Sequence, residues 1–178
     1  QYPDFLFPGK TQYVSPNDNA TKVDSIRVLD SANPISYITA AKRINKEAPD
    51  LLIIRYWMSS FGPSLGYVAR NMSKKTKVVA IMDNVTPHEP RFFDKPFANY
   101  FMKGVDGFVT MCEDVKRDLL SYNPDAKNVV IPHPLYTHFG QKMDKVEACK
   151  SLGIDPNKKT LLFFGLIREY KGLDILID

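Results

Sequence analysis

The stretch Thr160–Asp178 reads TLLFFGLIREYKGLDILID, and four of its first five residues are bulky and apolar. Such a run is typical of a strand that is buried on both faces of a parallel sheet. Gly165 interrupts the run, a short polar segment carries Arg168 and Lys171, and Gly172 precedes LDILI, which predicts the start of a helix. A strand, a loop and a helix form half of a βαβ unit, whose loop lies where open α/β sheets bind phosphorylated ligands.

The string FFG-x-I-R-x-Y-K-G-L-D-x-L in this stretch resembles the start of the nucleotide-binding domain in family 4 glycosyltransferases of the GT-B fold. In that family an arginine and a lysine of this loop contact the pyrophosphate of the sugar donor. The resemblance therefore implies donor-binding roles for Arg168 and Lys171. One departure is Leu166, which stands directly after the glycine, where many members have the arginine. The alternative is that both residues are ordinary surface cations of a βα loop.

Further upstream, apolar runs alternate with helical patterns at least four times. Strands are predicted at Ser25–Leu29, Leu51–Ile54, Lys77–Met82, Gly107–Met111 and Asn128–Ile131. The unbroken apolar run of Leu51–Ile54 predicts a strand buried on both faces. This alternation predicts an α/β fold, with a Rossmann-like parallel sheet, right-handed crossovers and helices on both faces.

Local signals predict where the helices begin and end. Asn33 is the expected N-cap of a helix with Pro34 at its first position, and Pro49 disfavours helical geometry just before it. Cys112 takes the N-cap place of another helix, with acidic residues in its first turn. Further helices are predicted from Gly62-Pro63 onward, at Pro96–Lys103 and at Met143–Leu152.

Ligands of such sheets bind beyond the carboxyl ends of the strands, and three segments of this sequence are expected to converge there. The segments are Arg55–Phe61, Asp83–Arg91 and Pro132–Phe139. Their polar and aromatic side chains are the candidate site residues Arg55, Trp57, Asn84, His88, Glu89 and His133. No pair of them has the spacing of two metal ligands on one helix, so no metal site is predicted.

The resemblance to family 4 glycosyltransferases extends over these segments, and it covers Leu51–Ile177 closely and residues 1–50 loosely. The string DNV-x-PHE resembles the family's loop that lines the acceptor cleft. Many members have a histidine at the exit of the strand predicted at Leu51–Ile54, where this chain has Arg55. The resemblance therefore points to His88 as the catalytic residue. The alternative is a loop histidine that caps backbone groups.

The remaining candidates are assigned to the acceptor. The resemblance implies that Arg55, Trp57, Asn84 and Glu89 bind it, with Trp57 as a platform for a sugar ring or a lipid-linked acceptor. For Trp57 the alternative is a partly buried aromatic side chain under the loop at Gly62. For His133 a structural role between two prolines is favoured.

The resemblance also predicts the domain organisation. Residues 1–140 are expected to form an acceptor-side Rossmann-like domain that lacks its first βα unit, and residues 141–159 a linker. Residues 160–178 are expected to be the first strand and loop of a truncated donor-binding domain. The chain is therefore interpreted as a fragment that transfers no sugar by itself.

Composition limits the class of protein. The 178 residues are 44% hydrophobic and 25% charged with a net charge of +4, which suits an ordinary soluble domain and gives no argument for nucleic-acid binding. The two cysteines lack metal-ligand spacing, and they suggest no disulfide framework, which favours a reducing compartment. No apolar run reaches about 18 residues. These observations predict a cytoplasmic protein, whose clustered lysines suggest peripheral contact with the inner face of a membrane.

The resemblance, taken with these features, implies a retaining, metal-independent glycosyltransferase. It would move a sugar from a nucleotide-diphosphate donor, its co-substrate, to a glycan or lipid-linked acceptor, in surface polysaccharide or lipopolysaccharide synthesis, without any cofactor. Two alternatives remain open. One is a non-catalytic α/β module that binds a nucleotide or a sugar, and the other is a sugar-nucleotide epimerase on the same fold.

Overall fold

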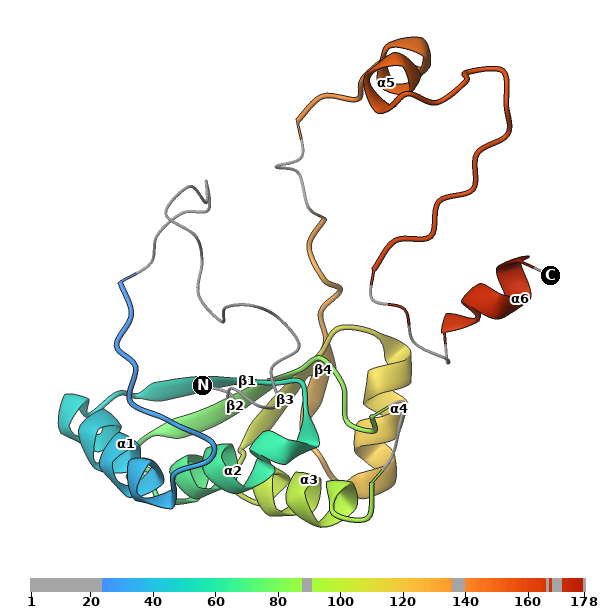
Figure 1. The fold of residues 1–178 in the computed structure, drawn as a ribbon. Coiled ribbons are helices and arrows are strands. Elements are labelled where there is room, and N and C mark those ends of the chain that lie inside the picture. The colour runs from blue at the N-terminus through green and yellow to red at the C-terminus, as the bar shows by residue number, and fades with distance from the viewer. Residues whose placement is uncertain (1–23, 88–90, 136–139, 166, 168–170, 178) are drawn as a thin grey trace. The chain divides into compact units, whose positions relative to one another are not determined.

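The computed structural model describes residues 24–87, 91–135, 140–165, 167 and 171–177, and it divides the chain into two compact units, Gln1–His133 and Pro134–Asp178 (Figure 1). The first unit contains, in chain order, α1 (Pro34–Glu47), β1 (Leu51–Tyr56), the 3-10 helix η2 (Ser59–Phe61), α2 (Gly62–Arg70), β2 (Lys77–Met82), α3 (Asp94–Met102), β3 (Gly107–Thr110), α4 (Glu113–Tyr122) and β4 (Asn128–Val130). The second unit contains α5 (Lys145–Leu152) and α6 (Leu173–Ile177).

The strands of the first unit form one four-stranded sheet in the order β1-β2-β3-β4, and every neighbouring pair is parallel. In the register, Leu51 lies opposite Lys77, Val79 opposite Gly107, and Phe108 opposite Asn128. The predicted α/β class, with a Rossmann-like parallel sheet flanked by helices, is confirmed, but helices on both faces are not seen among the described residues: α2, α3 and α4 all pack against the same face. Four of the predicted strands are present, each within two residues of its expected bounds.

One face of this sheet builds the core of the first unit. Alternate residues of the strands point inward, because successive side chains of a strand face opposite sides. They are Ile54, Tyr56, Val78, Ala80, Met82 and Phe108, which form one cluster with side chains of α2, α3 and α4. At its centre the rings of Tyr56 and Phe101 stack with centroids 4.5 Å apart and an interplanar angle of 10°. Such a pair contributes about 0.5–1.5 kcal/mol beyond its buried area.

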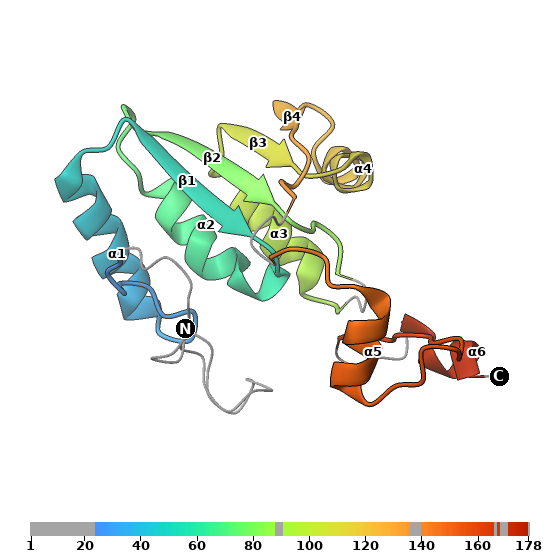
Figure 2. The same cartoon turned by 90° about the horizontal axis from the view of Figure 1, so that it is seen from above.

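The order of the strands determines on which face of the sheet the helices lie. Each strand pairs with the next one along the chain, so every crossover runs in the same direction across the sheet. Because such crossovers are right-handed, they place their helices on the same face. Figures 1 and 2 show α2 and α3 under one face of the sheet, and Leu119 of α4 belongs to the same core.

The opposite face of β1 is not buried, so the prediction that Leu51–Ile54 is covered on both faces is wrong. Leu51 and Ile53 are 50% and 58% exposed, whereas Ile54 and Tyr56 are buried. The physical reason is the crossover direction, which sends α2, α3 and α4 to the other face. An all-apolar strand thus shows that both of its faces carry apolar side chains, but it does not show that other elements cover both faces.

The predicted strand Ser25–Leu29 is also wrong, because residues 24–30 join no sheet. The end of this segment is tied to the helix that follows it. The Asp30 N–H donates to Ser36 Oγ at 3.0 Å, and that hydroxyl donates to the Asp30 carbonyl at 2.9 Å. These bonds anchor the segment at the first turns of α1 rather than along the free edge of β1.

The helix starts predicted at Pro34 and directly after Cys112 are confirmed. Asn33 caps α1 by accepting the Ile35 N–H at 3.0 Å, and Pro34 is its first residue. Cys112 occupies the N-cap position of α4, although its side chain makes no capping hydrogen bond. Helix α3 begins at Asp94, two residues before the predicted start at Pro96.

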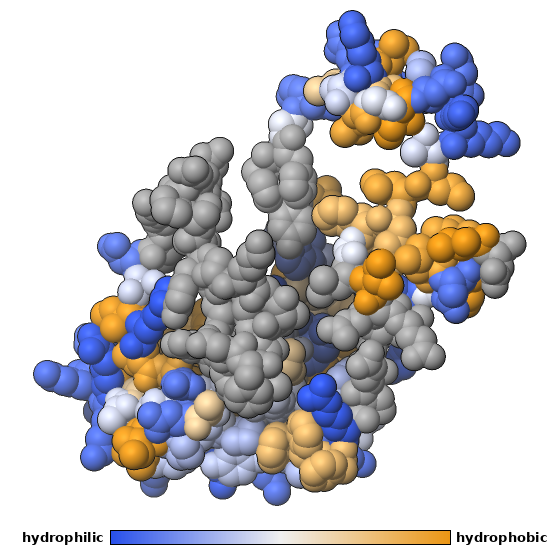
Figure 3. Space-filling model, in the orientation of Figure 1, coloured by the Kyte–Doolittle hydropathy of each residue, from blue (hydrophilic) through white to orange (hydrophobic). Residues whose placement is uncertain are grey.

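The second unit buries little apolar surface. Asp144 caps α5 by accepting the N–H groups of Val146 and Glu147, and α6 confirms the helix predicted from LDILI. Residues 160–164 form no strand here, and no described strand lies beside them to complete their hydrogen bonds, so their assignment as the first strand of a truncated donor-binding domain stays a prediction. Its apolar side chains are exposed, Leu162 by 83% and Phe164 by 89%, and apolar side chains of this unit are visible on the surface in Figure 3.

The contact between α2 and α3 depends on Gly62. A Cβ at this position would lie 2.4 Å from the Phe97 carbonyl oxygen, closer than real Cβ atoms approach any atom. We expect Gly62→Ala to lower the free energy of unfolding by roughly 1–3 kcal/mol, the usual cost of overpacking. The measurement is urea unfolding of the 178-residue chain, followed by circular dichroism.

Gly107→Ala is the matched control, since a Cβ there would meet only the Lys127 carbonyl oxygen at an ordinary 3.8 Å. It should unfold at the same urea concentration as wild type or a higher one. Equal midpoints for the two variants would contradict the close approach of α2 and α3 at Gly62.

Candidate functional site

The carboxyl edge of the sheet brings Arg55 and Asp83 together. Arg55 Nε lies 2.9 Å from Asp83 Oδ2, and the Asp83 N–H donates to the Tyr56 carbonyl at 2.9 Å. The arginine side chain is 58% exposed, and that of the aspartate only 20%. Arg55 therefore presents its remaining N–H groups to solvent while the aspartate fixes where they lie.

Asp83 lies in one of the segments that the sequence predicts at the site, but it is not among the candidate site residues predicted from the sequence. Its Oδ1 atom is buried and has no hydrogen-bond partner in the described part of the chain. The register could have identified it: Arg55 lies opposite Ile81, so Asp83, two residues on, follows on the same face of the neighbouring strand.

Trp57 and Asn84 continue the two strands beyond this ion pair. Trp57 is 41% exposed, and its ring packs against Phe61 with centroids 4.8 Å apart. Asn84 is exposed, and Val85 behind it is 2% exposed, so Val85 anchors this loop in the core. Trp57 thus combines an exposed fraction of 41% with packing against Phe61, as expected for a partly buried aromatic side chain under the loop at Gly62.

Three predicted site residues lie outside the described residues: His88, Glu89 and Arg168. Their roles stay predictions, as does the common cavity expected to unite His88 with the other acceptor candidates. His133 is described and exposed, at the end of the first unit. In the second unit, Lys171 Nζ lies 3.0 Å from where a Cβ on Gly165 would stand, so the lysine amino group sits over that glycine.

Beneath this edge lies a buried polar cluster that the sequence did not reveal. Ser59 and Asp94 are 4% and 5% exposed, and the Ser59 hydroxyl donates a hydrogen bond to Asp94 Oδ1. Asp94 Oδ2 accepts the backbone N–H of Arg91. The sequence signal was weak, since an acidic residue in the first turn of a helix ordinarily interacts with the N–H groups and the dipole of that turn.

Tyr56 completes the cluster from the sheet. Its side chain is fully buried, and its hydroxyl has no hydrogen-bond partner among the described residues. Burial raises the pKa of the phenol well above its ordinary value, and the negative charge of Asp94 and the Tyr122 phenol raise it further. The Tyr56 phenol therefore stays protonated near neutral pH and supplies no phenolate to the site.

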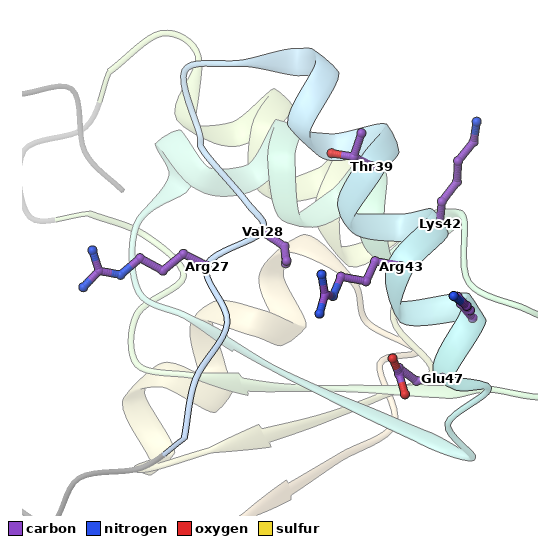
Figure 4. A pocket seen from close by; sticks show the side chains of 7 residues that line it. Arg27, Val28, Thr39, Lys42, Arg43 and Glu47 are labelled. Carbon is purple, nitrogen blue, oxygen red and sulfur yellow. The ribbon is translucent and has the colours of Figure 1, made fainter.

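Two hollows elsewhere in the first unit do not form a site of this kind. One, of about 690 Å³, lies between α1 and the segment before it, and is lined by Arg27, Val28, Thr39, Lys42, Arg43, Lys46 and Glu47. Figure 4 shows Arg43 pointing toward Val28, whereas Arg27 and Lys42 point away from this space. Its cations therefore do not converge on a single anion.

The second hollow, of about 390 Å³, lies at the opposite, amino edge of the sheet. There Asp106 accepts the Val78 N–H at 2.8 Å and pairs with Lys77 at 3.4 Å. These bonds, that of the Val78 N–H foremost, hold the pKa of the Asp106 carboxyl below its usual range, although partial burial opposes the shift. The hydrogen bond of Asp106 to Val78 thereby helps to fix how β2 pairs with β3.

Two negative findings apply to the described residues alone. No group of three or more His, Cys, Asp or Glu side chains in that part of the chain is arranged to hold a metal ion. None of its helices combines the length and the apolar character that a bilayer crossing requires.

The fold and the edge residues define a Rossmann-like α/β domain with one polar and aromatic edge available to a ligand. No family model matches the sequence. The chain is similar to the lipopolysaccharide core biosynthesis mannosyltransferase LpsB of Rhizobium meliloti (strain 1021), with 46% identity over 55 residues. The match covers 30% of this chain and 16% of that protein, so it spans a minor part of the relative's length.

The buried Tyr56 hydroxyl leads to a prediction about alkaline stability. Because the folded-state pKa lies above the unfolded value of about 10, the folded protein resists ionisation and loses stability as pH rises above about 10. Phenylalanine cannot ionise, so Tyr56→Phe should lose less stability between about pH 9 and pH 11. Near neutral pH its free energy of unfolding should stay within about 1 kcal/mol of wild type, because no hydrogen bond is lost.

Urea unfolding at several pH values measures both effects. Tyr100→Phe, at a tyrosine that is 37% exposed, is the control and should follow the wild-type curve. A Tyr56→Phe variant with the full alkaline loss of wild type would show that Tyr56 is not the group that titrates on unfolding.

Proposed function

We propose that this chain is part of a retaining glycosyltransferase of GT-B architecture, with its first unit on the acceptor side. The observation that carries the proposal is the 46% identity over 55 residues with a mannosyltransferase of lipopolysaccharide core biosynthesis. The enzyme moves a sugar from a nucleotide-diphosphate donor to a glycan or lipid-linked acceptor in the assembly of lipopolysaccharide or a related surface polysaccharide. The likeness to FFG-x-I-R-x-Y-K-G-L-D-x-L domains adds the GT-B architecture.

The geometry of the carboxyl edge supports an acceptor site. Open parallel sheets bind ligands beyond the carboxyl ends of their strands, and Arg55, Trp57 and Asn84 all lie there. Trp57, which is 41% exposed, offers an aromatic surface to a sugar ring, and Arg55, held by Asp83, offers N–H donors to its hydroxyl or phosphate groups. In this proposal Glu89 completes the acceptor contacts and His88 acts at the reacting centre.

The donor contacts come from the loop after residue 165. Cleavage of the donor leaves a diphosphate with developing negative charge, which positioned cations stabilise without a metal ion. Arg168 and Lys171 are the cations proposed for this role, and the amino group of Lys171 lies against the backbone of Gly165. In the proposed organisation residues 160–178 belong to a donor-binding domain, and 141–159 connect it to the acceptor side.

The remaining assignments follow from this activity. Nucleotide sugars are cytoplasmic substrates, so the enzyme acts in the cytoplasm. A lipid-linked acceptor brings it to the inner face of the membrane, where clustered cations such as Lys74, Lys75 and Lys77 each add about 1 kcal/mol of attraction to anionic lipid.

The deciding experiment is sugar transfer by the complete protein that contains this chain, with Arg168→Ala and Lys171→Ala as variants. Each should slow transfer at least about tenfold, since a positioned cation on a leaving phosphate contributes several kcal/mol at ~1.4 kcal/mol per tenfold in rate. Lys159→Ala, at an exposed cation in the connecting segment, is the control and should keep the wild-type rate.

Four outcomes would count against the proposal. Transfer within about twofold of wild type for both variants removes the pyrophosphate role. Transfer by the 178-residue chain alone overturns the two-domain organisation. A complete protein that binds nucleotide or sugar without transferring it is a binding module, and one that converts the donor into its epimer is an epimerase.

A further inference from the structure

The two loops that follow β1 and β2 are joined by a single buried carboxylate. Asp94 Oδ1 accepts the hydroxyl of Ser59, which lies in the segment after β1, and Asp94 Oδ2 accepts the Arg91 N–H, at the end of the segment after β2. The hydrogen bonds span 35 residues in one case and three in the other. One side chain thus reaches both segments that carry the acceptor candidates.

Asp94 does not act as an ordinary helix cap. It is the first residue of α3, whose N-cap position is Phe93, and no side chain caps the helix by a hydrogen bond. Both carboxylate oxygens are used on the preceding loops instead. Because the side chain is 5% exposed, its charge is taken out of water, which is costly unless each oxygen is hydrogen-bonded.

The surroundings keep this contact rigid. Next to Ser59, the turn of Gly62 packs directly against Phe97 of α3, with no room for a Cβ. On the other side, the phenol of Tyr56 is close enough for the charge of Asp94 to raise its pKa. The carboxylate therefore sits between the end of β1, the η2 segment and α3.

We propose that Asp94 is a positioning residue that fixes the loop bearing Trp57 relative to the loop bearing Asn84. Through its bonds to Ser59 and Arg91 it sets the spacing of the surface that receives the acceptor. The acceptor part of this inference rests on the proposed function, whereas the loop geometry does not. Misplacement by about 1 Å in such a surface can cost up to about a hundredfold in rate.

Trp57 allows the loop geometry to be tested in this chain directly. It is the one tryptophan of the sequence and lies two residues from Ser59, so its fluorescence reports on the β1 loop. Asp94→Ala removes both hydrogen bonds, and Ser59→Ala removes only the one to the β1 loop. We expect both to raise the acrylamide quenching constant of Trp57 about twofold, because the freed loop opens locally.

Two further variants separate positioning from folding. Asp94→Asn keeps the shape, and its amide can accept the Arg91 N–H while donating to the Ser59 hydroxyl, so quenching should stay close to wild type. Asp114→Asn is the matched control: Asp114 also stands in the first turn of a helix, but its side chain is 83% exposed and pairs with Arg117. It should change nothing.

In the complete protein, the same variants should separate the two substrates. Ser59→Ala and Asp94→Ala should raise the KM for acceptor about tenfold and leave the KM for donor within about twofold. Asp94→Asn should restore the acceptor KM. If Asp94→Ala fails to fold, Ser59→Ala against Asp94→Asn still gives the comparison.

Unchanged Trp57 quenching in Ser59→Ala and Asp94→Ala would overturn the proposal, and so would equal changes in the two KM values. A complete protein without sugar transfer would refute the proposed function, but the quenching result would still decide whether Asp94 holds the loops.

Discussion

The right-handed crossover between sequential parallel strands is the constraint on which this structure depends. Because β1 to β4 pair in the order of the chain, each connection turns the same way and leaves its helix on one face. The core, with Tyr56 stacked on Phe101, can then form only on that face. The same geometry brings the loops after β1 and β2 to one edge, where Arg55 meets Asp83.

The sequence was sufficient for features that depend on local chemistry. The Asn33-Pro34 pair predicted the start of α1, and the apolar run KVVAIM predicted β2. It was insufficient wherever the outcome depended on a distant neighbour. Ser25–Leu29 has the composition of a strand, but bonds between Asp30 and Ser36 hold the end of that segment to α1. Thr160–Phe164 has the composition of a buried strand, but no described strand pairs with it.

The candidate site likewise contains residues that could be predicted from the sequence and residues that could not. A side chain at the end of a strand or directly after it, such as Arg55 or Trp57, could be assigned to the carboxyl edge from the sequence alone, because topology determines where it lies. Asp94 could not be assigned, because its contact with Ser59 joins positions 35 residues apart and leaves no periodic pattern. Residues that contact a ligand follow from topology, whereas residues that hold those residues in place become visible only with the packing.

The uncovered face of the sheet has a consequence for work with this chain. Leu51 and Ile53 of β1 and Val129 of β4 are at least half exposed, and β1 is an edge strand of the described sheet. An apolar face beside unpaired backbone N–H and C=O groups can template the pairing of a second strand from another molecule. Self-association of the isolated chain should therefore grow with protein concentration, and dilute solutions are the right setting for spectroscopy on Trp57.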